Sequence, residues 1–347
     1  MKESAFKNSC RQSTYVAADS VLSLTEASRQ RLRTFLDTAD SASPFQDPQF
    51  FGGRGKGEVD LVVERGGRTI FFALGYENFA LSRLVPPLKA LYVQRGPVAE
   101  DAESFASGLL ALKELAQERR LCKIRINPQF TEDKAEQIKQ ACMALGFRPR
   151  PSTATLRLNV ARDMDDIVAR FRKATRYEIR RAERLGITVR RAETDADFSS
   201  VHQVYRQRAS HKGWSPMPAA DFAALSERIR AAPERSAALL SEYKNEILGV
   251  VVLLRAGARV HYLLGGIGGN AGNFPAMYPL FYRGIQWAKE IGCTEFDFGG
   301  YGPRGVASVN RFKDGFGGDM RTFVPGYTLT LTPLELVRLF RPQHFSR

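Results

Sequence analysis

The sequence predicts an α/β protein with two domains, each containing a mixed sheet. The chain has 347 residues, which suits two domains of roughly 150 residues each. Strand-like and helix-like patterns alternate in both halves, and a proline-rich stretch at 148–152 separates them. A hydrophobic content of 44% is sufficient for two cores and excludes disordered and collagen-like chains.

The first half is expected to begin with an arm and to continue as the first domain. Residues 1–40 form the arm, with one short amphipathic helix, and residues 41–150 form the domain. Branched and aromatic residues at 58–64 and 69–74 predict two strands joined by a glycine turn. The later elements expected here are a strand at 90–93, a helix at 102–120, a strand at 122–127 and a helix at 132–145.

The second domain, residues 151–325, repeats this alternation. A strand at 154–160 precedes an arginine-rich helix that ends at Gly186, and a strand starts at 187. The glycine-rich residues 265–272 are interpreted as a flexible loop that lines the site. The other elements expected are helices at 196–210 and 219–232, a hairpin at 236–254, a strand at 259–264, a helix at 278–291, a strand at 295–298, and a C-terminal segment at 326–347 with a strand and a short helix.

Several protein classes are excluded by what the sequence lacks. No apolar run approaches the roughly 18 residues of a membrane helix, and the first residues lack a signal-peptide core, so we expect no integral membrane segment and a cytoplasmic location. The cysteines lie far apart and the histidines form no metal-type pair, so neither disulfides nor a metal site are expected. The sequence has no nucleophile elbow and no complete phosphate-binding fingerprint, and we expect no bound cofactor.

Positive charge is concentrated in one segment. The chain carries 51 Lys and Arg residues against 37 Asp and Glu, a net charge of +14, and residues 170–191 contain nine basic side chains and two acidic ones. Apolar residues recur there every three or four positions, which predicts one amphipathic helix. Its basic face is either a solvated surface or a surface for nucleic-acid phosphates. The residues concerned are Arg170, Lys173, Arg176, Arg180 and Arg184.

Four segments in order along the chain resemble one known family. Residues 92–97 read Tyr-x-x-Arg-Gly-Pro, residues 175–186 read Thr-Arg-x-x-Ile-Arg-x-Ala-Glu-x-x-Gly, and Asp297-Phe-Gly-Gly precedes Arg311-Phe-Lys-Asp-Gly-Phe-Gly-Gly. Together they resemble the FemABX family of aminoacyl-tRNA-dependent peptidyltransferases, in its compact form without a coiled-coil arm. The resemblance implies two tandem acetyltransferase-like (GNAT-type) domains, an active cleft in or beside the second, and a C-terminal strand that packs back on the first.

The resemblance also implies the reaction, which is transfer of an amino acid from aminoacyl-tRNA to an amine of a peptide or small-molecule acceptor. The ester is already activated, so no nucleophilic side chain is needed, but the oxyanion must be stabilised. In the family this role belongs to the Phe-Lys of the last motif, which here is Phe312 and Lys313. We expect Lys313 in a glycine-flanked loop after a strand, and an exposed loop lysine without chemistry is the alternative.

Asp297 and three tyrosines are expected around this lysine. Asp297 ends a predicted strand, where it either accepts a proton or hydrogen bond from the acceptor amine or caps the strand. Tyr262, Tyr278 and Tyr301 flank the expected cleft, either as acceptor-binding residues or as packing in the core or rim.

The acceptor-binding motifs of the family are matched only in part. Members that hold a UDP-linked muramyl peptide carry Phe-Gln-Ser-x-x-Trp before a basic residue, but Asp47 and Phe50 replace the Ser and Trp here. In a second motif, Thr-Ala-x-Arg-x-Gly-Phe, Arg208 takes the position of the Thr and His211 that of the Arg. The diphosphate clamp is therefore rearranged, and another peptide, a small amine or a natural-product intermediate competes with the muramyl precursor as acceptor. The cations expected at the acceptor are Arg54, Lys56, Arg208 and His211.

Three functions stay open at this point. The first is the aminoacyl-tRNA-dependent N-aminoacyltransferase. The second is an N-acyltransferase on the same fold that uses acyl-CoA or an acyl carrier protein, which the positive charge also suits because carrier proteins are acidic. The third is a non-catalytic RNA-binding module. The amino acid transferred, the acceptor and the oligomeric state are left undecided.

Overall fold

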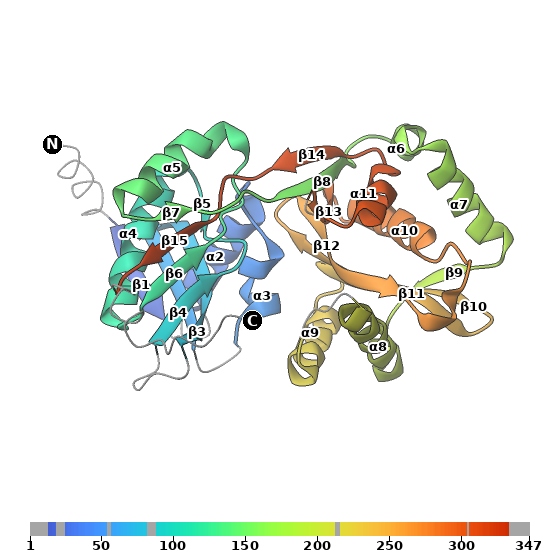
Figure 1. Ribbon diagram of the computed structural model, residues 1–347, viewed down its shortest axis with the longest axis horizontal. Coiled ribbons are helices and arrows are strands. Elements are labelled where there is room, and N and C mark those ends of the chain that lie inside the picture. The colour runs from blue at the N-terminus through green and yellow to red at the C-terminus, as the bar shows by residue number, and fades with distance from the viewer. Residues whose placement is uncertain are drawn as a thin grey trace, which may run out of the picture. The chain divides into compact units, whose positions relative to one another are not determined.

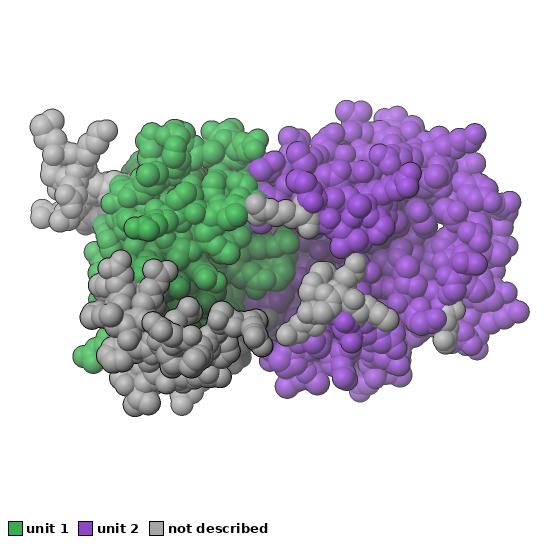
Figure 2. Space-filling view, in the orientation of Figure 1, with its two compact units in different colours: residues 1–48, 52–152, 323–347 green, residues 49–51, 153–322 purple. Residues whose placement is uncertain are grey.

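The computed structural model describes residues 13–18, 25–53, 57–81, 88–211, 216–303 and 305–332. The chain divides into two compact units, which are coloured separately in Figure 2. Unit 1 comprises residues 1–48, 52–152 and 323–347, and unit 2 comprises residues 49–51 and 153–322. The boundaries expected from the sequence are 150 and 325. Both units contain a mixed sheet with helices, which confirms the predicted fold class.

Unit 1 is built on an eight-stranded sheet in the order β1-β2-β3-β4-β6-β15-β7, with β5 paired to β3 (Figure 1). Its neighbours are antiparallel except β4 and β6, which are parallel. The strands are β1 (Ser13–Ala18), β2 (Glu58–Arg65), β3 (Arg68–Leu81), β4 (Leu88–Val93), β5 (Val98–Ala99), β6 (Lys123–Ile126), β7 (Arg148–Pro149) and β15 (Tyr327–Thr330).

The helices of unit 1 bury apolar faces against this sheet. Helix α4 packs on β3 and on α5, and it begins where Asp101 accepts a 2.8 Å hydrogen bond from the N–H of Ser104. Helix α2 contributes Phe35 and Leu36 to the buried residues. The expected helix at 333–340 and residues 1–12 and 19–24 of the expected N-terminal arm lie outside the described residues. The helices of this unit are α2 (Glu26–Thr38), α4 (Ala102–Glu118) and α5 (Ala135–Ala144), whereas residues 49–51 of the short α3 (Pro48–Phe51) belong to unit 2.

Unit 2 contains a seven-stranded sheet in the order β14-β8-β13-β12-β11-β10-β9. Here too one central pair, β12 and β13, is parallel, and the others are antiparallel. The strands are β8 (Ala154–Asn159), β9 (Thr188–Arg191), β10 (Ser236–Tyr243), β11 (Glu246–Ala256), β12 (Arg259–Ile267), β13 (Glu295–Tyr301) and β14 (Asp319–Thr322).

Helices cover both faces of the unit 2 sheet. In Figure 1, α8 (Asp195–His211) and α9 (Ala219–Ala231) lie on one face, and α10 (Met277–Glu290) lies on the other, where α7 packs against it. The core on the α10 side is rich in aromatic rings. Gly284 of α10 allows a close approach to the sheet, because a Cβ there would lie 2.7 Å from Leu253.

The predicted arginine-rich helix is interrupted, which corrects the sequence analysis. Helix α6 (Met164–Arg170) ends and α7 (Lys173–Arg184) begins around two residues with extended backbone, Phe171 and Arg172. Phe171 is 1% exposed, and its ring packs 5.2 Å from that of Phe316. The N–H of Arg172 donates to the carbonyl of Gly315 at 2.8 Å. The gain from burying this ring and pairing this N–H outweighs the local preference for one helix.

Two further expectations are wrong in their local structure. Lys313 lies not in a loop but in the last turn of α11 (Ala307–Asp314), and it is buried. Residues 265–267, expected in a flexible loop, continue strand β12. Their glycines allow neighbouring groups to approach closely, since a Cβ at Gly265 would lie 2.4 Å from the carbonyl oxygen of Val250.

Among the described residues, no helix is long and apolar enough to cross a membrane.

Candidate functional site

The two parallel strands of unit 2 separate at one end. β12 and β13 pair only as far as His261 and Asp297, although β12 continues to Ile267 and β13 to Tyr301. Each strand meanwhile keeps its other neighbour, β11 or β8. The result is an opening at the C-terminal ends of two adjacent parallel strands, a position where ligands bind in many α/β folds. We call it the β12–β13 opening.

The parallel pair of unit 1 stays closed. β4 and β6 remain paired to their last residues, and the next residue, Asn127, donates its N–H to the carbonyl of Gly96 at 2.8 Å. The buried side chain of Gln46 forms 2.9 Å hydrogen bonds to the backbone of Leu74 in β3 and of Gln94, the residue after β4. Among the described strands, only unit 2 separates its parallel pair.

Lys313 lies beside the β13 edge of the opening. The residue is 5% exposed, and its Nζ donates to the carbonyl oxygens of Gly299 at 3.2 Å and Gly300 at 2.6 Å. A buried ammonium loses its hydration, and these carbonyls replace part of it. The positive charge is therefore held where β13 leaves β12.

Asp297 is surrounded by hydrogen-bond donors and is 1% exposed. Its Oδ1 accepts from the Thr155 hydroxyl and, at 2.7 Å, from the N–H of Gly299. Its Oδ2 accepts from Nε of Arg157 at 3.2 Å and lies 3.8 Å from Nδ1 of His261. Because both oxygens are engaged, the geometry favours a positioning role for Asp297 over proton transfer with an acceptor amine.

Gly299 connects these two charged side chains. Its N–H is held by Asp297 and its carbonyl by Lys313. Its φ is +72°, a conformation that favours glycine. The backbone of β13 at the opening is thus fixed from both sides.

Phe312 and two of the predicted tyrosines surround the same centre. The ring of Tyr278 packs 5.0 Å from that of Phe312, and the ring of Tyr262 packs 5.0 Å from that of Phe281. Phe281 and Phe312 are themselves 5.3 Å apart. One aromatic cluster therefore joins β12, α10 and α11 beside the opening.

The tyrosine hydroxyls are held in their protonated form. Tyr301 donates to Oδ1 of Asp314 at 2.5 Å, and this hydrogen bond raises the pKa of Tyr301. Burial raises the pKa of Tyr262 and of Tyr278. The three side chains are neutral donors across the ordinary pH range.

The glycines after α11 are required by close packing. A Cβ at Gly315 would lie 2.2 Å from Oγ1 of Thr175, and one at Gly317, whose φ is +70°, would lie 2.5 Å from the carbonyl oxygen of Arg170. The contact of Gly315 brings the 175–186 motif and the 311–318 motif together, and that of Gly317 joins the second motif to the end of α6. The start of α7 is therefore fixed to the loop that follows Lys313.

The predicted tRNA-binding residues fall into two groups. Arg170 forms a 3.5 Å ion pair with Asp319, and Arg176 donates to the carbonyls of Ala169, at 3.2 Å, and of Phe171. Arg176 thus caps the end of α6 instead of reaching outward. The others are exposed and have no acidic partner among the described residues: Lys173, Arg180 and Arg184.

Arg208 is the one predicted acceptor-binding cation whose side chain is described. It packs on β12, with its Cδ 3.1 Å from the position that a Cβ of Gly266 would take. Its charge opposes the rise that burial causes in the pKa of Tyr262. The other three lie outside the described side chains: Arg54, Lys56 and His211.

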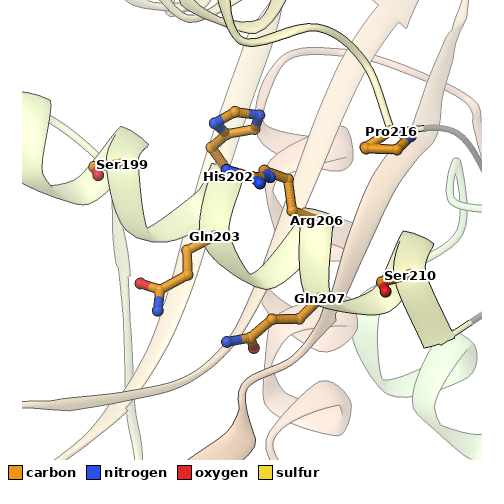
Figure 3. A pocket seen from close by; sticks show the side chains of 7 residues that line it. All are labelled: Ser199, His202, Gln203, Arg206, Gln207, Ser210 and Pro216. Carbon is orange, nitrogen blue, oxygen red and sulfur yellow. The ribbon is translucent and has the colours of Figure 1, made fainter.

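A separate pocket of about 750 Å³ lies on α8 (Figure 3). Buried residues such as Val201 and Val204 face the opposite side of this helix, so the pocket is not part of the β12–β13 opening. One member, His202, stacks on Phe222 with ring centroids 4.4 Å apart, and burial lowers its pKa. The lining residues are Ser199, His202, Gln203, Arg206, Gln207, Ser210 and Pro216.

Sequence reasoning missed the partners of Asp297. Thr155, Arg157 and His261 are buried on β8 and β12. A signal was available, since Arg157 is flanked by two leucines in a strand that otherwise reads as apolar. Within the described ranges, no group of three or more His, Cys, Asp or Glu side chains could hold a metal ion.

Comparisons with known proteins agree with this architecture. Residues 169–314 match the acetyltransferase (GNAT) domain family. The crystal structure of FemX is similar with a TM-score of 0.77 at 16% identity, covering 91% of this chain and 98% of that chain. A tandem GNAT protein from the clavulanic acid biosynthesis pathway has a TM-score of 0.57 at 10% identity, covering 92% and 99%. The structure of L-PGS from Bacillus licheniformis has a TM-score of 0.52 at 13% identity, covering 78% of this chain and 84% of that chain.

No curated protein matches the sequence significantly. The similarity to these solved structures establishes the fold, and the GNAT match lies within unit 2, where the parallel strands open. The chain thus consists of two tandem GNAT-like domains, and this architecture supports an acyltransferase.

Proposed function

We propose that the protein is an aminoacyltransferase of the FemABX type that moves an amino acid from aminoacyl-tRNA to an amine of a peptide or small-molecule acceptor. The observation that carries this proposal is the buried Lys313 ammonium at the β12–β13 opening, because a fixed cation suits a developing oxyanion. The four motifs and the FemX-like fold support it.

The proposed reaction needs no covalent intermediate on a protein side chain. The acceptor amine attacks the carbonyl carbon of the aminoacyl ester, a C–N bond forms, and the carbonyl oxygen becomes an oxyanion. Collapse breaks the C–O bond to the tRNA ribose, and the ribose oxygen receives the proton that the amine loses. Lys313 stabilises the oxyanion with its charge, and the rings of Phe312 and Tyr278 exclude water around it.

The other residues hold the reactants. Asp297 positions the β13 backbone on which Lys313 rests. The hydroxyl of Tyr278, together with Arg208, binds the acceptor. The hydroxyls of Tyr262 and Tyr301, which donate their protons to Gly265 and Asp314, accept hydrogen bonds from the acceptor amine. The exposed cations of α7 bind tRNA phosphates. In this proposal unit 2 carries the chemistry, and unit 1, whose parallel strands stay closed, does not.

Replacing Lys313 by Ala tests the proposal. We expect turnover with charged tRNA to fall by about two orders of magnitude or more, as for the loss of an oxyanion donor, while affinity for tRNA is unchanged. Transfer is measured with total charged tRNA and candidate acceptor amines, and the product mass identifies the group moved. Activity of the unaltered protein that survives RNase, with acyl-CoA as donor, contradicts the proposal.

An acyl-CoA- or acyl-carrier-dependent N-acyltransferase is the second candidate, and the match of residues 169–314 to an acetyltransferase family favours it. The product mass and the RNase sensitivity of the unaltered protein separate the two candidates. If an acyl-CoA is the donor, the product carries an acyl group without an amino nitrogen, and RNase has no effect on the activity.

A further inference from the structure

An exposed tyrosine stands within the row of free cations on α7. Lys173, Tyr177, Arg180 and Arg184 are spaced by four, three and four residues, which places them on one face of a helix. We call these four residues the α7 stripe. The opposite face is buried, with Thr175 at 3% exposure and Ala182 fully inaccessible.

Tyr177 is unusually exposed for an aromatic residue. It is 53% exposed, and the Cζ atom of Arg184 lies 5.7 Å from the centre of its ring. The ring does not belong to the aromatic cluster beside the opening. Single exposed apolar side chains are common on protein surfaces, so it is the position of Tyr177 among three cations that carries the argument.

The cations of the stripe are also distinct from other basic residues in this segment. Arg170, Arg172 and Arg181 are engaged with Asp319, Asp314 and Glu178. Among the described residues, no carboxylate pairs with the three cations of the stripe. A row of cations interrupted by an exposed ring suits a single-stranded nucleic acid, since the cations meet phosphates and the ring stacks on a base. A duplex offers its phosphates, but along its stem the base faces are covered by stacking on one another.

The stripe begins at the candidate site. Arg172, directly before Lys173, donates its N–H to Gly315 in the loop that follows Lys313. The helix has 12 residues and is therefore about 18 Å long. A strand bound along the stripe can thus lead to the loop that carries the candidate oxyanion lysine.

We propose that Tyr177 is a base-stacking platform for the unpaired 3′ end of an RNA donor, held by Lys173, Arg180 and Arg184 along α7. This inference rests on the proposed function and names the part of the donor that α7 binds. It assigns the stacking to one side chain and the phosphate contacts to the other three.

The test uses two uncharged RNA hairpins of identical stem, one with a four-nucleotide 3′ overhang and one blunt. We expect the unaltered protein to prefer the overhang hairpin in fluorescence anisotropy. Tyr177→Ala lowers affinity for the overhang hairpin about tenfold, within the range for one stacked base, and leaves the blunt hairpin unchanged. Tyr177→Phe retains the preference, because the ring is kept.

Two control variants separate stacking from charge and from unfolding. Arg180→Gln with Arg184→Gln weakens both hairpins and flattens the salt dependence. Phe79→Ala, in unit 1, removes a ring that is 61% exposed and changes neither affinity. Melting temperatures of all variants are compared, and we expect no loss for Tyr177→Ala because an exposed helical position accepts alanine.

Equal losses for both hairpins on Tyr177→Ala, or no loss for either, overturn the inference. Its failure is distinct from that of the proposed function, because the RNAs carry no amino acid. Overhang preference that depends on Tyr177, without any aminoacyl transfer, leaves the stacking site standing and removes the proposed reaction. If aminoacyl transfer proceeds equally well with Tyr177→Ala, the proposed reaction stands and the stacking site is ruled out.

Discussion

Two buried charges of opposite sign hold one glycine of β13 from its two ends. The Asp297 carboxylate accepts the N–H of Gly299, and the Lys313 ammonium donates to its carbonyl. Such charges are tolerated inside a protein only when several polar groups surround them. The position of Lys313 therefore depends on groups that lie on β8, β12 and β13.

Asp297→Asn keeps the shape of the side chain and removes its charge. Because Arg157 then stays buried without its closest partner carboxylate, we expect the free energy of unfolding to fall by about 3 kcal/mol or more. We also expect turnover to fall more than acceptor KM rises, since the new amide nitrogen faces the Nε donor of Arg157 and shifts the side chain that anchors Gly299. Denaturant unfolding and steady-state transfer assays measure the two effects.

Glu295→Gln is the matched control for this variant. Its carboxylate accepts from Arg259 at 2.8 Å and lies 3.5 Å from Arg157, but it is 32% exposed. Because solvent screens this carboxylate, we expect Glu295→Gln to lower the free energy of unfolding and the turnover less than Asp297→Asn does. Equally large decreases for the two variants contradict a special role for Asp297.

Gly317→Ala tests the contact between the loop that follows Lys313 and the end of α6. The new Cβ meets the carbonyl of Arg170 at 2.5 Å and also imposes a positive φ on alanine. Gly292→Ala, at the end of α10, shares the positive φ, but no atom lies within 4 Å of its Cβ. We expect Gly292→Ala to lose about 1 kcal/mol of unfolding free energy and Gly317→Ala clearly more. Equal shifts in melting temperature speak against the packing argument.

At the scale of elements, the first turn of α8 is closed by a reciprocal cap. The N–H of Asp197 donates to Oγ1 of Thr194 at 3.1 Å, and Oδ2 of Asp197 accepts from the N–H of Thr194 at 3.0 Å. Arg190 of β9 adds hydrogen bonds of 2.6 and 3.0 Å to the same carboxylate. These donors, Arg190 first, hold the pKa of Asp197 well below its usual range.

This lowered pKa makes the contribution of Asp197 depend on pH. A carboxyl whose pKa is depressed by folding stabilises the native state above its ordinary pKa of about 4, and this stability is lost as pH falls through the folded value. The difference in unfolding free energy between the unaltered protein and Asp197→Asn should therefore be largest near pH 7 and shrink below about pH 4. Urea unfolding across pH 3–7 measures it.

The control for the cap is Asp195→Asn. Asp195 also accepts from an arginine, Arg230, at 2.5 Å, but its side chain is 89% exposed. We expect only a small difference in unfolding free energy, because solvent screens an exposed ion pair. If the difference for Asp197→Asn does not shrink as the pH falls, the assignment of the pH dependence to its buried cap is contradicted.

At the scale of the whole molecule, the C-terminal strand completes the sheet of unit 1. β15 lies between β6 and β7, and its Tyr327 is inaccessible to solvent. Burial raises the pKa of Tyr327 to about 12. Unit 1 therefore contains segments from both sides of unit 2 in the sequence.

Ending the chain after Val324, and separately after Thr332, isolates the effect of this strand. The first protein lacks β15 and the second keeps it. We expect amides of β4 and β6 to lose hydrogen-exchange protection in the first protein relative to the second, while amides of β11 in unit 2 do not change. Equal protection of β6 in both proteins contradicts a structural role for β15.

Much of the element order was predictable because it depends on local patterns. The hairpin expected around Lys244 and Asn245 is present as β10 and β11, with both turn residues at positive φ. The expected helices 196–210, 219–232 and 278–291 correspond to α8, α9 and α10 within a residue or two. The residues Lys313, Phe312, Asp297, Tyr262, Tyr278 and Tyr301 lie in one region of unit 2.

The sequence by itself determined the two-domain α/β class, the concentration of charge at 170–191 and the motifs that meet at the site, since composition and periodicity carry this information. Only the tertiary structure decided that Phe171 interrupts the basic helix, that Lys313 is buried, and that β12 and β13 part after His261 and Asp297. Each of these depends on groups distant in sequence: the ring of Phe316, the carbonyls of Gly299 and Gly300, and strand pairings on either side. Long-range packing and hydrogen bonding outweigh local propensity at these places because they bury rings and satisfy charges that no short segment can accommodate alone.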